Sequence, residues 1–167
     1  DGGDSYGFNE FTATENLNHG YVAIGVIIAY SNPEKQLAYP FTYSDSFEDD
    51  FSASFVSGGL PLERAGTTTI SAIGYGTLIL PAGTVNNVLL IKMEQDYGDS
   101  YEGSEIGHYN TEIYQFLLPG VHYPILSFTG LTISGGAPSY SGQFNSDESL
   151  AIKEEITASL NLYPNPV

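Results

Sequence analysis

The clearest strand signal in the chain is the segment Phe47-Glu48-Asp49-Asp50-Phe51-Ser52-Ala53-Ser54-Phe55. Successive side chains of a β-strand point to opposite faces, so residues two apart share a face. The three phenylalanines and Ala53 fall on one face, whereas Glu48 and Asp50 fall on the other with the serines. The segment therefore predicts a half-buried strand with one wet face.

Strand-like patterns extend over most of the chain on either side of this segment. Tyr, Phe, Thr, Val and Ile dominate the apolar runs, and turn-forming residues separate them. Gly58-Gly59, Pro81-Ala82-Gly83-Thr84 and Gly135-Gly136 are turn signals that favour antiparallel pairing. The pattern predicts an all-β fold, an antiparallel β-sandwich of jelly-roll type with about ten short strands. A closed barrel is the alternative. The predicted strands cover residues 9–14, 21–30, 36–43, 47–56, 66–73, 76–80, 87–95, 111–117, 125–134 and 139–144.

Composition limits the classes of partner. The 167 residues include 20 acidic and four basic side chains, which gives a formal net charge of −16. Such a field repels phosphate backbones and anionic lipids, so nucleic-acid partners and membrane insertion are not expected. It attracts cations, calcium above all, although solubility in salty surroundings explains the same composition. The chain has no cysteine, which excludes disulfides and thiolate metal sites.

The composition changes towards the C-terminal end, and this change divides the chain. We expect a β-sandwich domain over residues 1–146 and a charged linker over residues 147–161. The last six residues are Leu162-Tyr163-Pro164-Asn165-Pro166-Val167. They resemble the opening of the C-terminal sorting domain carried by cargo of the type IX secretion system. The strands that follow in that family are absent after Val167, so residues 162–167 are expected to be a truncated start of such a domain.

A second resemblance covers the middle of the chain. The run Gly74-Tyr75-Gly76-Thr77-Leu78-Ile79-Leu80-Pro81-Ala82-Gly83-Thr84 is similar to a segment of uncharacterised domains that precede such tails. Tyr114 and Tyr123-Pro124-Ile125-Leu126 match its continuation. The resemblance implies a secreted or cell-surface domain that meets the type IX machinery through the missing tail. It implies no activity.

Acidic residues are concentrated between Asp96 and Glu105. The four carboxylates of Asp96, Asp99, Glu102 and Glu105 recur every three residues, and Gly98 and Gly103 lie among them. Calcium prefers several oxygen ligands from a flexible loop, so this segment is the candidate metal site. The spacing does not match an EF-hand. The alternative is a solvated hairpin loop in an acidic protein.

Tyrosines Tyr97, Tyr101 and Tyr109 are the candidate ligand-binding residues. An exposed tyrosine platform can stack on sugar rings and hydrogen-bond through its hydroxyls. The chain has no tryptophan, which weakens a sugar platform, and half-buried tyrosines at strand ends are the simpler interpretation. The three histidines lie outside zinc-binding spacings, and no serine lies in a nucleophile elbow, so no catalytic residue is assigned.

These observations favour a non-catalytic module of a secreted or cell-surface cargo protein, with a structural, adhesive or ligand-presenting role. The alternative is a carbohydrate-binding accessory domain of a secreted hydrolase. An enzyme in its own right is the third hypothesis. Extracellular polysaccharide or protein would be the partner in the first two.

Overall fold

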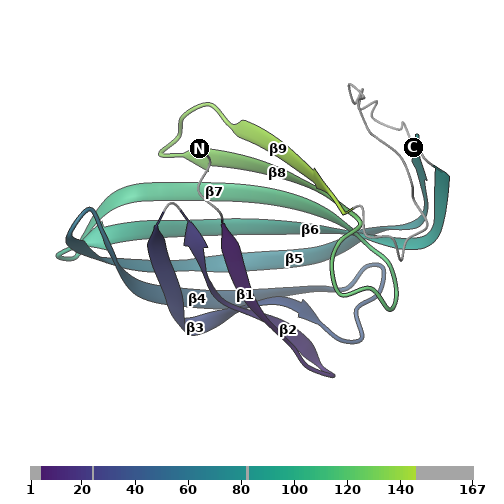
Figure 1. The fold of residues 1–167 in the computed structure, drawn as a ribbon, viewed down its shortest axis with the longest axis horizontal. Helices are drawn as coiled ribbons and strands as arrows, with labels where there is room; N and C mark the ends of the chain where they lie inside the picture. The colour runs from purple at the N-terminus through teal and green to yellow at the C-terminus, as the bar shows by residue number, and fades with distance from the viewer. Residues whose placement is uncertain (1–4, 24, 82, 146–167) are drawn as a thin grey trace.

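The computed structural model describes residues 5–23, 25–81 and 83–145 of the chain. Within these residues the secondary structure is nine β-strands and no helix (Figure 1). The strands are β1 (Tyr6–Phe11), β2 (Glu15–Ala23), β3 (Val26–Ala38), β4 (Ser46–Ser57), β5 (Leu60–Leu80), β6 (Gly83–Tyr101), β7 (Ser104–Leu117), β8 (Leu126–Ile133) and β9 (Ser139–Phe144). The all-β prediction is confirmed. The described part of the chain contains no helix that is long and apolar enough to cross a membrane.

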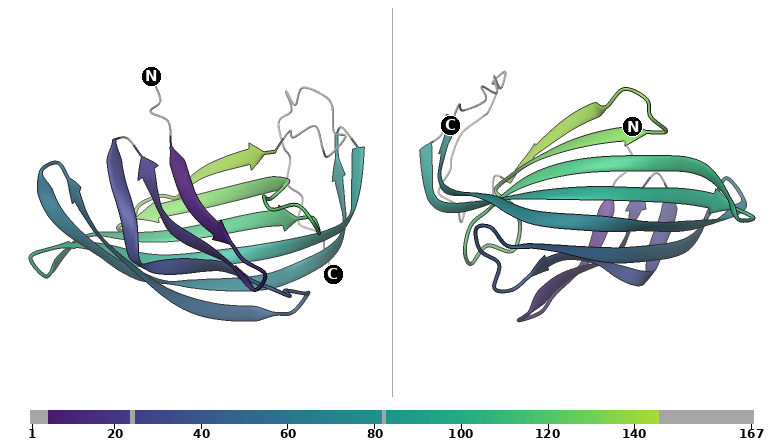
Figure 2. Two further views of the ribbon diagram at one scale, coloured as in Figure 1. Left: turned by 60° about the horizontal axis from the view of Figure 1, so that its bottom comes forward. Right: turned by 180° about the vertical axis from the view of Figure 1, so that it is seen from behind.

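The nine strands form one antiparallel sheet in the order of the sequence, β1 to β9. The sheet curls into a half-barrel, whose inner side is called the concave face below (Figure 2). The predicted sandwich of jelly-roll type is not confirmed, because every strand pairs with its chain neighbours in a single sheet. Strands β5 and β6 are 21 and 19 residues long, so the prediction of short strands is wrong for this central hairpin.

The predicted break near Gly74 is replaced by irregular pairing within β5. The β5–β6 register shifts between Ala72 and Gly74 and again between Gly76 and Leu78. Such β-bulges bend a strand without ending it. Two predicted strands, residues 66–73 and 76–80, are therefore one.

Strands β1, β2 and β3 cross the concave face in front of the long strands (Figures 1 and 2). Strand β3 connects the crossing strands to the long strands. It pairs with β4 only around Tyr30 and Asn32, and it pairs with β2 along most of its length. Leu37 of β3 packs in one buried cluster with Ile70, Ala72, Ile91 and Met93 of β5 and β6. The core thus lies between the crossing strands and the long strands.

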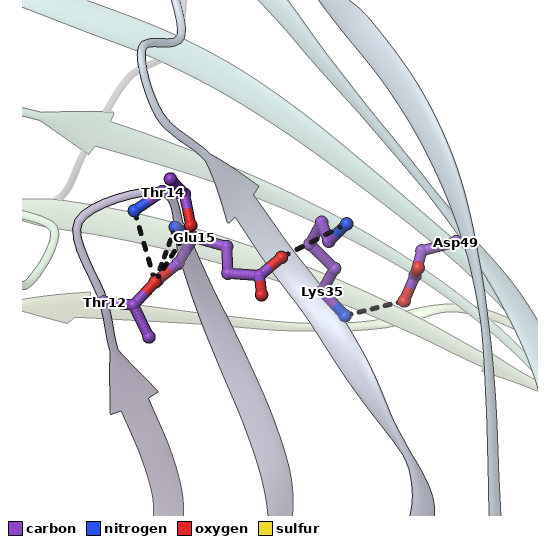
Figure 3. Close-up of polar contacts among 5 residues, drawn as sticks. All are labelled: Thr12, Thr14, Glu15, Lys35 and Asp49. Atoms are coloured by element: carbon purple, nitrogen blue, oxygen red, sulfur yellow. Dashed lines mark hydrogen bonds and ion pairs between the residues drawn. The ribbon is translucent and has the colours of Figure 1, made fainter.

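Polar contacts connect the β1–β2 turn to the sheet below it (Figure 3). The Thr12 hydroxyl accepts hydrogen bonds from the backbone N–H groups of Thr14 and Glu15, at 3.2 and 3.0 Å. The Glu15 carboxylate lies 3.3 Å from the Lys35 ammonium, and the Lys35 backbone N–H donates to Asp49 Oδ2 at 2.7 Å. At Lys35, β3 no longer pairs with β4 through the backbone, and the Asp49 side chain of β4 accepts the hydrogen bond of the Lys35 N–H instead.

The alternation predicted for β4 is confirmed. Phe51 and Ala53 are each 2% exposed and Phe55 is buried, whereas Glu48 and Asp50 are exposed. The Gly58-Gly59 turn joins β4 to β5, and both glycines have positive φ angles, 59° and 81°. A two-residue hairpin turn of this hand matches the twist of the strands, and glycine adopts it without strain.

Candidate functional site

A pocket of about 750 Å³ opens on the concave side, where β1, β2 and β3 meet residues 118–124. Its volume lies within the range of roughly 300 to 1,000 Å³ that is usual for small-molecule sites. Six aromatic rings line it: Phe11, Tyr39, Phe41, Tyr43, Tyr75 and Tyr123. Five carboxamides line it as well: Asn9, Asn16, Gln36, Asn87 and Gln115. The described lining residues include no Asp, Glu, Lys or Arg.

Aromatic contacts close one side of this pocket. The Phe11 ring, at the end of β1, lies 5.2 Å from the His122 ring and 5.7 Å from the Tyr123 ring, measured between centroids. His122 and Tyr123 belong to the segment between β7 and β8, so these contacts connect the first strand of the sheet with its far side. Aromatic pairs in tilted or edge-to-face geometry contribute about 0.5 to 1.5 kcal/mol beyond area burial.

A bulge in β3 sets the side chains of the pocket floor. Asn16 pairs with Leu37 and Leu17 pairs with Lys35, so Gln36 is the extra residue. The bulge lets both Glu34 and Leu37, three positions apart, point to the buried side. Asn16 and Leu37 lie next to one another as a consequence, and both line the pocket.

The tyrosines and carboxamides in the rest of the pocket lining carry no charge. Burial raises the pKa of Tyr39, so its phenol is uncharged near neutral pH. The Tyr75 hydroxyl donates to Asn87 Oδ1 at 3.0 Å across the β5–β6 pair. The pocket can therefore offer hydrogen bonds and ring faces, but no full charge while His122 is neutral.

A buried ion pair lies further along the concave face. The Arg64 guanidinium donates from Nε and Nη2 to the two carboxylate oxygens of Asp99, at 2.7 and 2.8 Å. It also donates to the Tyr21 hydroxyl and lies 4.5 Å from the centroid of Tyr97. Burial is the main cause that raises the pKa of Tyr97 to about 12. The Nε, Nη1 and Nη2 atoms of Arg64 all donate hydrogen bonds to side chains of this protein, so we assign the ion pair to the protein interior.

Glu34 is a third buried residue with an ionisable side chain, and it is 0% exposed. Its Oε1 accepts hydrogen bonds from Thr68 Oγ1 at 2.5 Å and from Gln95 Nε2. Its Oε2 accepts from Asn18 Nδ2 at 3.2 Å and Gln36 Nε2 at 3.3 Å. Four neutral donors thus solvate the carboxylate in place of water.

The predicted acidic loop is mostly strand. Asp96 and Asp99 belong to β6, Glu105 belongs to β7, and Glu102 occupies the turn between them with a φ of 49°. Asp99 is buried against Arg64, whereas Asp96 is exposed beside His108, whose Nε2 lies 3.1 Å from its Oδ1. The structure thus separates Asp99 from the other three carboxylates. In the described ranges no group of three or more His, Asp or Glu residues is placed to hold a metal ion. Calcium binding here stays a prediction.

Two of the three candidate tyrosines are brought together. The rings of Tyr97 and Tyr109 stack at a centroid distance of 4.9 Å and an interplanar angle of 14°. Both rings lie within 6 Å of the Arg64 guanidinium, at 4.5 and 5.6 Å. Tyr101 packs elsewhere, against the buried cluster that includes Phe55 and Leu62. The three rings are half-buried, as in the simpler interpretation, and their ligand binding stays a prediction.

Sequence reasoning missed the pocket and the ion pair. The pocket draws its walls from segments scattered between Asn9 and Pro124, and no local pattern connects them. A signal for Arg64 did exist, because it shares its face of β5 with Leu62, Thr68 and Ile70, all of which are buried. Extending the alternation of β5 backwards from Thr68 would have placed this arginine inside.

Comparisons of the chain with protein-family models, with curated proteins and with solved structures found no match.

Proposed function

We propose that this domain is a non-catalytic binding module whose pocket takes a neutral, largely apolar small molecule. One observation carries the proposal: in a chain of net charge −16, the described lining of its large pocket holds no Asp, Glu, Lys or Arg, and His122 is its one basic side chain. Among the described residues, the charged side chains that are buried have partners of their own, Arg64 with Asp99 and Glu34 with four neutral donors, so a large pocket lined without carboxylates, lysines or arginines is a specific feature. It suits a ligand that brings no charge with it.

Physical chemistry points the same way. Burying apolar ligand surface against rings and aliphatic side chains is favourable by about 25 cal/mol per Å². An anionic ligand would meet no cation in the lining and would be repelled by the net charge. A catalytic site needs an acid, base or nucleophile within hydrogen-bond reach of a partner group. Among the described lining residues His122 is the only imidazole, and no carboxylate lines the pocket with it, which favours binding over chemistry.

The test is titration of the protein with Nile red, a neutral apolar dye whose fluorescence rises in apolar surroundings. We expect saturable binding to the native protein and at least tenfold weaker binding to Val121→Trp, because the indole is much larger than the valine side chain and would fill part of the pocket. Ile79→Trp is the matched control, since Ile79 is 79% exposed and does not line the pocket. Equal binding by both variants and the native protein would contradict the proposal.

The second candidate is carbohydrate binding. The combination of six rings with five carboxamides supports it, because sugars combine ring faces with many hydroxyls. Calorimetric titration with neutral oligosaccharides separates the two candidates. Sugar binding that Val121→Trp abolishes, together with no Nile red binding, would favour the carbohydrate interpretation.

We also propose that the module is secreted or displayed on the cell surface as type IX cargo. The support is the Leu162 to Val167 motif, which lies outside the described residues. Deletion of the chain from Leu162 onward is expected to leave the otherwise full-length protein in the periplasm. Normal export of the deleted form would contradict this proposal.

A further inference from the structure

Asn16 carries an unsatisfied polar group in the pocket wall. Its Oδ1 atom is buried and has no hydrogen-bond partner, and it is the one buried side-chain atom of this kind in the described residues. A buried acceptor without a partner destabilises the folded protein, because water satisfied it in the unfolded chain. Such groups are uncommon in native proteins, and each calls for an explanation, such as a bound ligand or an ordered water molecule.

The two residues that pair with Asn16 in the sheet are apolar, and Gln36, the extra residue of the neighbouring bulge, lines the same pocket. In the sheet Asn16 pairs with Phe11 on one side and with Leu37 on the other, and all three residues line the pocket. The register shift that follows Asn16 in the β2–β3 pairing makes this alignment. Bulges commonly direct side chains next to binding sites. A carboxamide is thus built into the wall between two apolar neighbours in the sheet.

We propose that the Asn16 carboxamide selects the ligand, which is a neutral apolar molecule with one hydroxyl or N–H donor. This rests on the proposed binding function of the same pocket. The proposal requires a rotation of the Asn16 side chain that brings the buried Oδ1 to the cavity, where the ligand donor supplies the missing hydrogen bond. Apolar molecules without a donor leave the oxygen unsatisfied, and carboxylates bring a charge that the lining does not compensate.

The experiment compares three naphthalenes that differ at one position: 2-naphthol has a donor, 2-methoxynaphthalene has none, and 2-naphthoate is an anion. Each displaces Nile red from the native protein, from Asn16→Leu and from Gln115→Met. We expect 2-naphthol to bind the native protein about tenfold more tightly than the ether or the anion, as one net hydrogen bond implies. Asn16→Leu is expected to bind the phenol and the ether equally. Gln115→Met, the matched loss of another lining carboxamide, is expected to keep the preference.

A second measurement does not depend on any ligand. Leucine has nearly the shape of asparagine and no acceptor, so ligand-free Asn16→Leu is expected to melt at the native temperature or above it. A lower melting temperature would show that the carboxamide already has a structural role, and would overturn the proposal. So would equal affinities of the native protein for the phenol and the ether. Nile red binding that persists beside either result leaves the pocket function intact, whereas absence of dye and naphthalene binding removes both proposals.

Discussion

Arg64 and Asp99 form a two-pronged ion pair in the interior, with N–O distances of 2.7 and 2.8 Å and side chains that are each 7% exposed. They lie on neighbouring strands, where the register pairs them directly. The guanidinium also lies 5.4 Å from the Phe55 centroid and 4.5 Å from the Tyr97 centroid. The pair therefore joins the hydrophobic cluster of β4 to the stacked tyrosines of β6 and β7.

Removing only the cation should be costly. Arg64→Met leaves the Asp99 carboxylate buried without its partner, and losses of about 3 to 5 kcal/mol follow when a buried pair is broken in this way. Urea unfolding of Arg64→Met and of the double variant Arg64→Met/Asp99→Leu measures this loss. The double variant should recover most of the stability, because no unpaired charge remains. Lys35→Met is the control for a half-exposed pair, with an expected loss below about 1 kcal/mol. Equal stability of the single variant and the native protein would contradict the prediction.

Glu34 provides a test of how a buried carboxylate is solvated. Glu34→Gln keeps the size of the side chain but turns an NH₂ group towards donors such as Thr68 and Gln95. We expect a loss of about 1 to 3 kcal/mol in the free energy of unfolding, which is the range for a buried polar group left without its partner. Glu48→Gln on the wet face of β4 is the matched control and should change little. If both variants unfold at the same urea concentration, the hydrogen bonds to Glu34 contribute nothing net.

The calcium hypothesis makes a narrower prediction once Asp99 is seen to be held by Arg64. Calcium binding would require Asp96, Glu102 and Glu105 of the β6–β7 hairpin to come together, because in the described residues no three His, Asp or Glu side chains are placed to hold a metal ion. Thermal melts should then rise more in calcium than in magnesium, and Asp96→Asn should remove the difference. Binding to the folded state alone gives about 2.7 kcal/mol at a hundredfold excess over Kd. Equal shifts with both ions would indicate charge screening and would contradict the hypothesis.

Local alternation was enough to predict the fold class and the buried face of β4, because the order of apolar and polar residues within a strand indicates which of its faces is buried. It was not enough for the sheet. Gly74 was taken as the end of a strand, but the bulges around it let β5 continue, and strand continuation depends on the neighbouring strand. The sequence pattern places Asp99 in the candidate metal loop, with a solvated hairpin as the alternative, and it does not indicate the ion pair because Arg64 is 35 positions away in the chain. The pocket depends on how β1 to β3 cross the long strands, and the sequence of any one segment does not indicate this crossing.

Gly66 is a position in β5 where a side chain would collide with β6, and this position gives the last prediction. Gly66 pairs with Phe51 on one side and with Tyr97 on the other. A Cβ placed on it would lie 2.4 Å from the backbone oxygen of Asp96 and 2.7 Å from the Tyr97 Cα. Backbone atoms in the middle of a sheet cannot move aside without separating the strands, so Gly66→Ala should lower stability by more than about 1 kcal/mol, as other overpacking changes do.

The control for Gly66 lies in the same strand. A Cβ on Gly76 would meet nothing within 4 Å, so Gly76→Ala tests the general effect of replacing glycine in β5. Alanine loses less conformational freedom on folding, so this variant should be as stable as the native protein or slightly more stable. Urea unfolding with the same denaturant slope for all three proteins gives the comparison. Equal midpoints for Gly66→Ala and Gly76→Ala would show that β5 and β6 do not approach each other at Gly66 as closely as described.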